Sequence, residues 1–424
     1  MEPANTESSG SDPRVLCAFN VNMDCVHTIT GDEIKRLSQC IEFAVENSEI
    51  PSTISSVDDL IISILYHMRR GTGGELLINN ENVSDEIASL FPWETRMGGN
   101  AGNIANVLAA LGAEPVVNVP SLTPRQASLF HPAVRVPVTD GGVSLTSPFD
   151  ASEEGQELRH FVIQYRGGER IDTPSGRFTA PRENRIIATF DPLNRVMHLN
   201  PSFRAFLEKP DPDVRGVILS GFHLVPCELH REIFEERLRS MSEWLATRYS
   251  HAEMGGFERP EIMRYLLEIM EVESIGMNED ELSMLVDSGD DWEAIAGAAE
   301  QIHDEFDIPR VCVHTREFTV SISPDPRKEI AALGLGAEIA GRFAATGCIE
   351  KDVKLGLSDD GKRAVDDLLR LGGMRAGLGA FKERDGFSVC VHPSFISPEP
   401  VTTVGLGDAL TAATFYMLVT SFIP

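Results

Sequence analysis

The chain has 424 residues, more than one compact core usually needs, so its length predicts a large domain with a smaller domain or a substantial insert. Its 65 acidic and 37 basic residues give a formal charge of −28, which argues against a nucleic-acid-binding surface. No run is apolar and long enough to cross a bilayer, so we expect no membrane partner. The seven cysteines include no CxxC pair, which favours buried free thiols in a reducing cytoplasm over a zinc site.

The first third of the chain alternates between strand and helix patterns. Residues 1–13 are polar and predict a disordered leader. "RVLCAFNVNMD" then predicts a strand, and "VDDLIISILYHMRRG" predicts a helix that ends at Gly71. "RMGGNAGNIANVLAALGA" predicts a glycine turn and an amphipathic helix, followed by the strand "EPVVNVP". This order is typical of an α/β fold.

The middle of the chain has a different pattern. Short alternating runs between residues 140 and 195 predict a small antiparallel sheet, which we interpret as a lid or inserted domain. After residue 210, "VRGVILSGFHLV", "IPRVCVHTREFTVSI" and "GFSVCVHP" predict further core strands. We therefore expect a large α/β domain within residues 14–424, with a discontinuous lid from roughly 24–45, 72–97 and 138–196.

"TVGLGDALTA", near the end of the chain, places two glycines and an aspartate at the start of an apolar helical run. The backbone N–H groups of Gly405, Leu406 and Gly407 would then form an anion cradle at the positive end of a helix. A carboxylate at Asp408 could take a proton from a hydroxyl that attacks a bound phosphate. The alternative is an ordinary helix cap, since aspartate is favoured there.

Two acidic motifs are candidates for a magnesium site. In "SIGMNEDELSML", Asn278 and Glu281 are three residues apart, which fits either a capping box or a carboxylate that holds Mg²⁺ through water. In "RYSHAEMGGF", His251 and Glu253 alternate along a predicted strand and so share one face. Glu253 could face the same metal, or this could be a solvated strand end.

Amides and acids near the start of the chain fit a ligand rich in hydroxyl groups. In "AFNVNMDCV", Asn20, Asn22 and Asp24 alternate, which is unusual on the core face of an apolar strand. "RMGGNAGN" offers either close backbone approach to a ligand or a simple glycine turn, at Gly98, Gly99 and Asn100.

Arginines are dense in the predicted small sheet of this very acidic chain. Most of them fit an exposed surface, but one or two could clamp a phosphate on the acceptor. They are Arg159, Arg166, Arg170, Arg177, Arg182, Arg185 and Arg195.

Taken in order, these motifs resemble the ribokinase-type carbohydrate kinases, and within them the archaeal ADP-dependent phosphofructokinases and glucokinases. The resemblance covers residues 14–420, and its weak individual motifs are specific as a set. They are "NxNxD" at Asn20–Asp24, "RMGGNAG" at Arg96–Gly102, "PRENR" at Pro181–Arg185, "HAE" at His251–Glu253, "GMNEDEL" at Gly276–Leu282, "VHT" at Val313–Thr315 and "TVGLGD" at Thr403–Asp408.

The resemblance implies a ribokinase-like three-layer sandwich with a mostly parallel central sheet and a smaller lid based on a β-sheet. It implies Mg²⁺-dependent transfer of the β-phosphoryl group of ADP to fructose 6-phosphate, giving fructose 1,6-bisphosphate and AMP, with glucose as a further acceptor. The alternatives are an ADP-dependent glucokinase, an ATP-dependent nucleoside or sugar kinase of the same superfamily, and a sugar-binding protein without enzymatic activity. We expect a cytoplasmic monomer or small homo-oligomer that acts on small molecules.

The resemblance also implies roles for residues of this chain. Asp408 would be the catalytic base beside the Gly405, Leu406 and Gly407 amides, and Glu253, Glu281 and Asp408 would organise Mg²⁺. The nucleotide would lie near Asn278, His314, Thr315 and Val404. The acceptor would contact Asn22, Asp24, Glu75, Arg96, Gly98, Gly99, Asn100 and Arg185, with Glu75 in the region where glucose-accepting members carry a glutamate. Two departures concern acceptor fit: Asn100 replaces the usual glutamine, and two glycines follow "HAE" closely, at Gly255 and Gly256.

Overall fold

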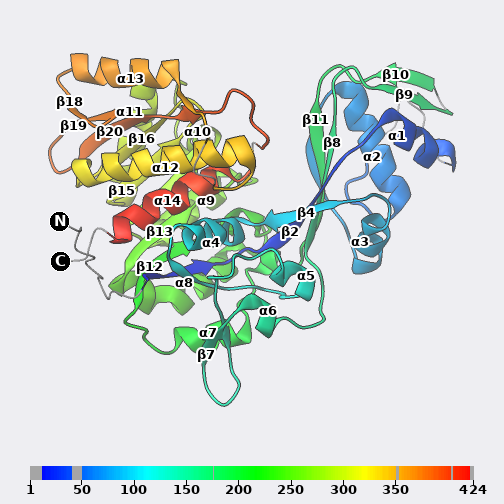
Figure 1. Ribbon diagram of the computed structural model, residues 1–424, viewed down its shortest axis with the longest axis horizontal. Coiled ribbons are helices and arrows are strands. Elements are labelled where there is room, and N and C mark those ends of the chain that lie inside the picture. Colours follow the sequence, from blue (N-terminus) through cyan, green and yellow to red (C-terminus); the bar gives the residue numbers. More distant parts are fainter. Residues whose placement is uncertain (1–11, 41–49, 175, 350–352, 403, 421–424) are drawn as a thin grey trace, which may run out of the picture.

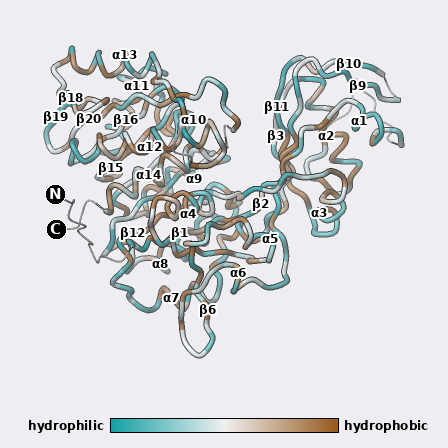
Figure 2. Tube along the Cα trace, in the orientation of Figure 1, coloured by the Kyte–Doolittle hydropathy of each residue, from teal (hydrophilic) through white to brown (hydrophobic). Residues whose placement is uncertain are grey.

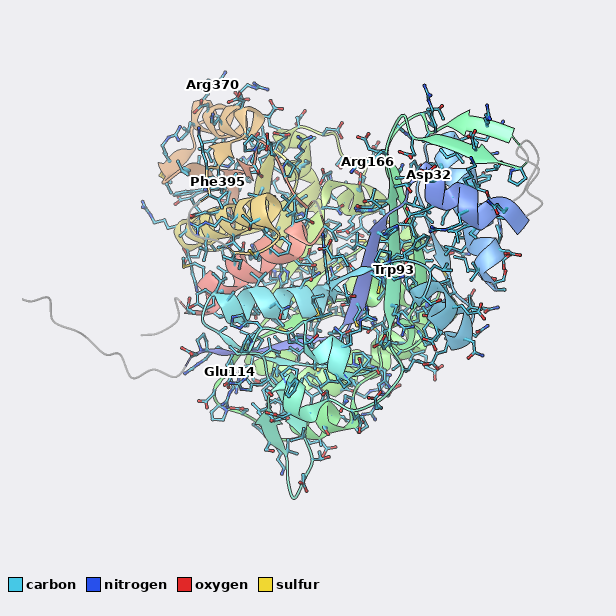
Figure 3. All side chains as sticks on the ribbon, turned by 45° about the vertical axis from the view of Figure 1, so that its right-hand side comes forward. Asp32, Trp93, Glu114, Arg166, Arg370 and Phe395 are labelled. Carbon is cyan, nitrogen blue, oxygen red and sulfur yellow. The ribbon has the colours of Figure 1, made fainter. Side chains whose placement is uncertain are left out.

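The computed structural model describes residues 12–40, 50–174, 176–349, 353–402 and 404–420, so the expected leader lies almost wholly outside the described residues. Two β-sheets organise the chain into a larger and a smaller part, which stand side by side in Figure 1. Figure 3 labels Asp32, Trp93 and Arg166 on the smaller part and Arg370 and Phe395 on the larger.

The large sheet has ten strands, and the six from β15 to β5 run parallel. The other four extend the sheet by antiparallel pairing. In spatial order the strands are β18 (Met374–Ala376), β19 (Gly379–Glu383), β20 (Ser388–Pro393), β16 (Phe318–Ser323), β15 (Arg310–His314), β14 (Ser274–Asn278), β13 (Tyr249–Glu253), β12 (Val214–Leu219), β1 (Arg14–Ala18) and β5 (Glu114–Val117).

Helices cover both faces of this sheet because its strands are apolar on both sides. Along β1, Val15 and Cys17 face one helical layer while Leu16 and Ala18 face the other. The first layer holds α4 (Asn100–Ala110), α12 (Pro326–Thr346) and α14 (Leu406–Thr420). The second holds α7 (Pro201–Leu207), α8 (His230–Thr247), α9 (Pro260–Ile269), α10 (Glu279–Leu285), α11 (Trp292–Phe306) and α13 (Asp359–Arg370). The predicted α/β class with a mostly parallel central sheet is confirmed.

The smaller part has a five-stranded sheet and its own apolar core, and Figure 2 shows hydrophobic residues along its helices. Its strands are, in spatial order, β3 (Gly74–Leu77), β11 (Asn184–Phe190), β8 (Arg159–Tyr165), β2 (Asn22–Thr28) and β4 (Glu94–Gly98). Three helices pack on one face: α1 (Gly31–Leu37), α2 (Val57–Arg70) and α3 (Glu81–Ala88).

Two details of packing differ from the segments that we assigned to the lid. Helix α2 lies outside those segments, yet Leu60 and Ile64 share the core of the smaller part. The hairpin of β6 (Val136–Val138) and β7 (Ser144–Thr146) lies largely inside them, but its Leu145 packs against the core of the larger part. Packing of apolar side chains places both elements. The alternating sequence pattern from which we predicted the lid does not show which core such side chains join.

The chain passes between the two sheets four times, and the first two crossings lie side by side. The single strand predicted from "RVLCAFNVNMD" is in fact two, since β1 ends at Ala18 in the large sheet and β2 begins at Asn22 in the small one. The antiparallel partner of β2 is β4, which leads through Gly99 directly into α4.

The remaining elements are β9 (Arg170–Thr173), β10 (Gly176–Thr179), β17 (Gly356–Leu357), β21 (Phe395–Ile396), α5 (Pro124–Ala127), α6 (Pro148–Ala151) and the 3₁₀ turns η1 (Ser38–Cys40), η2 (Asn194–Val196) and η3 (Phe222–Leu224).

Candidate active site

Asp408 lies in the first turn of α14, with its side chain buried beside α4. The Asn100 side-chain amide donates to Oδ1 over 2.7 Å, and the Asn103 amide donates to Oδ2 over 3.0 Å. Burial raises the pKa of Asp408 to about 6, although these two hydrogen bonds act against that rise. Two amides thus fix a carboxylate that changes protonation near neutral pH.

The glycines before Asp408 have steric reasons to be glycine. Gly405 has a φ of 77°, in the left-handed region that residues with a Cβ seldom adopt. A Cβ on Gly407 would lie 2.9 Å from His314 Cε1, so only glycine lets the helix start approach that ring. The backbone N–H groups of the first turn, from Gly405 through Gly407, have no partner within the helix and can bind an anion there.

Glu253 lies at the end of β13 and is held by three donors. His251 Nε2 is 3.2 Å from its Oε2, Thr411 Oγ1 donates to the same oxygen over 2.8 Å, and His314 Nε2 is 3.3 Å from Oε1. Burial acts to raise the pKa of Glu253, but the contacts with His251 and His314 prevail and lower it to about 2. Gly276 on β14 leaves room for this carboxylate, since a Cβ there would lie 2.3 Å from Oε2.

Asn278 and Glu281 form the capping box that their spacing allowed. The Asn278 side chain accepts from the Glu281 N–H over 2.8 Å, and Glu281 Oε2 accepts from the Asn278 N–H over 2.9 Å. The carboxylate is also buried, which raises the pKa of Glu281 to about 7, and the charges of Glu253 and Asp408 add to that rise. The cap uses only one carboxylate oxygen of Glu281, so the other oxygen can still contribute to a magnesium site.

The described residues contain no group of three or more His, Cys, Asp or Glu side chains arranged as direct metal ligands. Three carboxylates nevertheless share one buried neighbourhood, since Glu253 acts on the pKa of both Asp408 and Glu281. Burial of carboxylates is costly without a compensating cation. These residues fit Mg²⁺ that keeps much of its water shell.

The smaller sheet turns a polar face toward this site. Asp24 pairs with Arg96 on one side and with His160 on the other, and Arg185 pairs with Gln164. A cavity of about 940 Å³ lies over this face and reaches the start of α14. Its lining joins both parts of the molecule, with Asp24, Arg96, His160, Gln164 and Arg185 from the smaller part and Asn103, Phe343, Val404 and Gly405 from the larger.

The crossing point between the two parts carries further predicted acceptor residues. The Asn22 side chain donates to Asp24 Oδ1 over 3.0 Å, while its own Oδ1 is buried without a partner. A Cβ on Gly98 would lie 2.3 Å from both of these side chains, and Gly99 has a φ of 78°. Asn20, which we expected on the same strand face, instead bonds to Asn100 over 3.1 Å. An unpaired buried acceptor is suited to a hydroxyl donor on a ligand.

The residues predicted near the nucleotide lie at the ends of β14 and β15 and just before α14. His314 uses Nε2 on Glu253, and Asn278 caps α10. The hydroxyl of Thr315 donates to Phe318 O over 2.8 Å and closes the turn between β15 and β16. Val404 is exposed at the cavity wall.

Comparison with known proteins decides between the kinase classes. The conserved region described as "ADP-specific Phosphofructokinase/Glucokinase conserved region" matches residues 13–417. The chain belongs to this family. The kinase is 26% identical over 439 residues to an ADP-dependent glucose/glucosamine kinase of Pyrococcus abyssi, covering 96% of this chain and 95% of that protein. It is also 26% identical over 447 residues to an ADP-specific phosphofructokinase of Pyrococcus furiosus, covering 95% and 96%.

Solved structures share the fold of the kinase. A hypothetical ADP-dependent phosphofructokinase from Pyrococcus horikoshii superposes with a TM-score of 0.85 at 21% identity, covering 97% of this chain and 98% of that one. Among the described residues of the kinase, no helix has both the length and the hydropathy needed to cross a membrane.

Sequence reasoning missed three polar residues of the site. Asn103 is three residues after Asn100, a helical spacing that puts both amides on one face, so this signal was available. His160 and Gln164 are four residues apart on β8, so both side chains lie on the face of the strand that lines the cavity. Burial acts to lower the pKa of His160, but contact with Asp191 raises it. Thr411 carried no signal, because its role depends on Glu253 from a distant strand.

Proposed function

We propose that this kinase transfers the β-phosphoryl group of ADP to a sugar hydroxyl and releases AMP, with fructose 6-phosphate as the main acceptor. The observation that carries the proposal is the position of Asp408: a buried carboxylate at the N-terminus of α14, next to a cavity lined by polar side chains of the smaller sheet. Membership of the family and the names of both relatives support ADP as the donor.

Asp408 would act as the base in this reaction. Its carboxylate takes the proton of the acceptor hydroxyl, while the backbone N–H groups at Gly405, Leu406 and Gly407 stabilise charge on the transferred phosphoryl group. Asn100 and Asn103 hold both carboxylate oxygens in place, so the base does not have to be reoriented during the reaction.

Glu281 and Glu253 would hold Mg²⁺ through water molecules, and Asp408 would complete the acidic surroundings. When bound, Mg²⁺ neutralises charge on the phosphate oxygens. On the nucleotide side, the backbone of Thr315, the ring of His314, the amide of Asn278 and the apolar side chain of Val404 would contact ADP.

The acceptor would bind against the smaller sheet, which we propose closes as a lid and excludes water. Asn22, Asp24 and Asn100 would bond to its hydroxyl groups, with the Gly98 and Gly99 backbone close by. Arg185 is exposed at the cavity and its guanidinium forms no ion pair with a described residue, so it can clamp the 6-phosphate. Arg96 is less available because it pairs with Glu94 over 2.8 Å.

A second acceptor, glucose, is favoured by a specific observation. Glu75 on β3 accepts from Thr189 Oγ1 over 2.7 Å, and Thr189 pairs with His160 on the cavity face of β8. A carboxylate there can accept hydrogen bonds from sugar hydroxyl groups without any need for a phosphate. Cys17, Cys25, Cys312 and Cys390 are buried free thiols, which supports our proposal of a cytoplasmic enzyme.

The proposal is tested by steady-state turnover with Mg²⁺, with fructose 6-phosphate and glucose as separate acceptors and ADP and ATP as separate donors. Formation of AMP that needs both ADP and a sugar supports it, and the ratio of kcat/KM values ranks the acceptors. Turnover with ATP but not with ADP would refute the donor assignment. Nucleosides offered as acceptors test the other class of the superfamily.

A further inference from the structure

A continuous network of buried polar side chains lies beneath the site. It runs from Glu329 at the start of α12, through Arg310 on β15 and Ser274 on β14, to His251 on β13. All four side chains are buried, and Glu329 and Ser274 have no exposed surface. The network ends at Glu253, in the candidate active site.

The far end of this network is anchored by a buried ion pair. Arg310 donates to Glu329 from Nε, over 3.1 Å to Oε1 and 2.9 Å to Oε2, and from Nη2, over 2.8 Å to Oε1. Such a pair gives little net stability, because removing both charges from water costs about as much as their attraction returns. Arg310 has one further interaction in this network: Nη1 donates to Ser274 Oγ over 2.8 Å.

The direction of every later hydrogen bond follows from that donor. Arginine can only donate, so Ser274 Oγ accepts from Arg310 and is free to donate its own proton. Its partner is His251 Nδ1, 2.8 Å away. At the other end, the carboxylate of Glu253 can only accept, so His251 Nε2 must carry the hydrogen across the 3.2 Å contact.

A neutral imidazole ring carries one hydrogen, on one of its two nitrogens. With that hydrogen on Nε2, Nδ1 is an acceptor, and it receives the proton of Ser274. Arg310, Ser274 and His251 therefore donate head to tail toward Glu253. A ring flip or a change of tautomer would oppose two lone pairs or two hydrogens somewhere in the network.

We propose that Ser274 and Arg310 are positioning residues, which fix His251 as the Nε2–H tautomer and so hold the Glu253 carboxylate in its orientation at the active site. This inference rests on the proposed function for the role of Glu253 toward Mg²⁺. Residues that hydrogen-bond to the side chains around a metal ion keep those side chains in orientation. Loss of such a residue typically lowers metal affinity or activity by about 10- to 100-fold. A small cavity beside the network is lined by Arg310, His251 and Thr414, and Thr414 Oγ1 is buried there without a partner.

The first experiment reads the tautomer directly in the ligand-free protein. ¹⁵N-histidine NMR of the full chain would show His251, identified among the 11 histidines by its loss in His251→Gln. We expect Nε2 to carry the hydrogen in the native protein and a shifted or mixed tautomer in Ser274→Ala. The matched control is Ser321→Ala, which removes another fully buried serine hydroxyl from β16, two strands away from β14 in the same sheet. A native His251 with its hydrogen on Nδ1, or a tautomer unchanged in Ser274→Ala, would overturn the proposal.

The second experiment measures function in the same variants. Ser274→Ala should raise the Mg²⁺ concentration needed for half-maximal activity by about tenfold or more and leave KM for the sugar nearly unchanged. Ser274→Thr keeps a hydroxyl and should restore the native values. The paired change Arg310→Met with Glu329→Leu removes both buried charges without orphaning either, so it should fold while showing the same defect as Ser274→Ala.

The two experiments separate this inference from the proposed function. If the protein phosphorylates no sugar, the proposed function fails, while the NMR result still decides whether Ser274 and Arg310 set the tautomer. If activity is present and Ser274→Ala changes KM for the sugar instead of the response to Mg²⁺, the positioning of Glu253 is refuted.

Discussion

Asn103 on α4 donates to Oδ2 of Asp408 on α14 over 3.0 Å, although 305 residues separate them in the chain. The contact joins the helix that follows the smaller sheet to the helix that carries the proposed base. Because the amide favours the charged carboxylate, it lowers the pKa of Asp408 against the effect of burial.

Asn103→Leu should therefore weaken the base without removing it. We expect kcat to fall about tenfold and the acid limb of the pH–rate profile to move to higher pH, because loss of the donor raises the pKa of Asp408 further. Asn106→Leu is the matched control on the same helix, since the Asn106 side chain lines the same cavity but bonds to Leu129 O and the His131 N–H instead of to Asp408. An unshifted acid limb in Asn103→Leu would show that this amide does not lower the pKa of Asp408.

The native enzyme should lose activity in acid as Asp408 takes up a proton. Burial raises the pKa of Asp408 to about 6, so the carboxylate is the main form above pH 6 and is lost below it. The acid limb of kcat/KM should thus have a midpoint near pH 6, measured with a sugar acceptor that does not itself titrate there, such as glucose. An acid limb near the ordinary aspartate value, about 4, would contradict the buried position.

Stability should depend on pH and Mg²⁺ together. Folding raises the pKa of Glu281 to about 7, so its stabilising contribution is present in acid, below the unfolded value, and is lost as the pH rises through 7. Mg²⁺ should offset this loss, so the increase in Tm on adding Mg²⁺ should be larger at about pH 8 than at about pH 5.5. Differential scanning calorimetry of the native protein and of Glu281→Gln checks this, because the variant should lose most of the difference between the two pH values.

Arg185→Ala should distinguish the two acceptors. If its guanidinium clamps the 6-phosphate, KM for fructose 6-phosphate should rise by about tenfold or more, while KM for glucose stays nearly unchanged. Arg177→Ala on β10 is the control, because this exposed arginine belongs to the outer hairpin and pairs with Asp172. Equal effects on both sugars would instead favour a contact between Arg185 and the nucleotide.

The sequence indicated which residues carry the chemistry of the site better than it indicated which distant residues contact one another there. "TVGLGD" and "GMNEDEL" are local motifs whose turns and caps form within a few residues, so Asp408 and Glu281 could be placed on their helices beforehand. The contact between Asn20 and Asn100 was not foreseeable, because nothing local shows that the chain leaves the large sheet at Ala18 and enters the smaller one at Asn22.

The fold class followed from periodicity, but the extent of the smaller part did not. Helix α2 has the amphipathic pattern of any surface helix, and this pattern does not say which sheet it covers. Its placement depends on long-range packing of Leu60 and Ile64 against the smaller sheet. The network from Arg310 to Glu253 was hidden for the same reason, since Ser274 looks like any small residue in a buried strand.

The role of Asp408 as the base is tested by comparing the native enzyme with Asp408→Asn under the same conditions. ³¹P NMR would follow ADP and fructose 6-phosphate with Mg²⁺. We expect AMP and fructose 1,6-bisphosphate in equal amounts from the native enzyme, and a rate lower by about 100-fold or more in Asp408→Asn with ADP binding retained. Equal rates in the two proteins would contradict the role of Asp408, and a native enzyme that forms bisphosphate only from ATP would contradict the assignment of the donor.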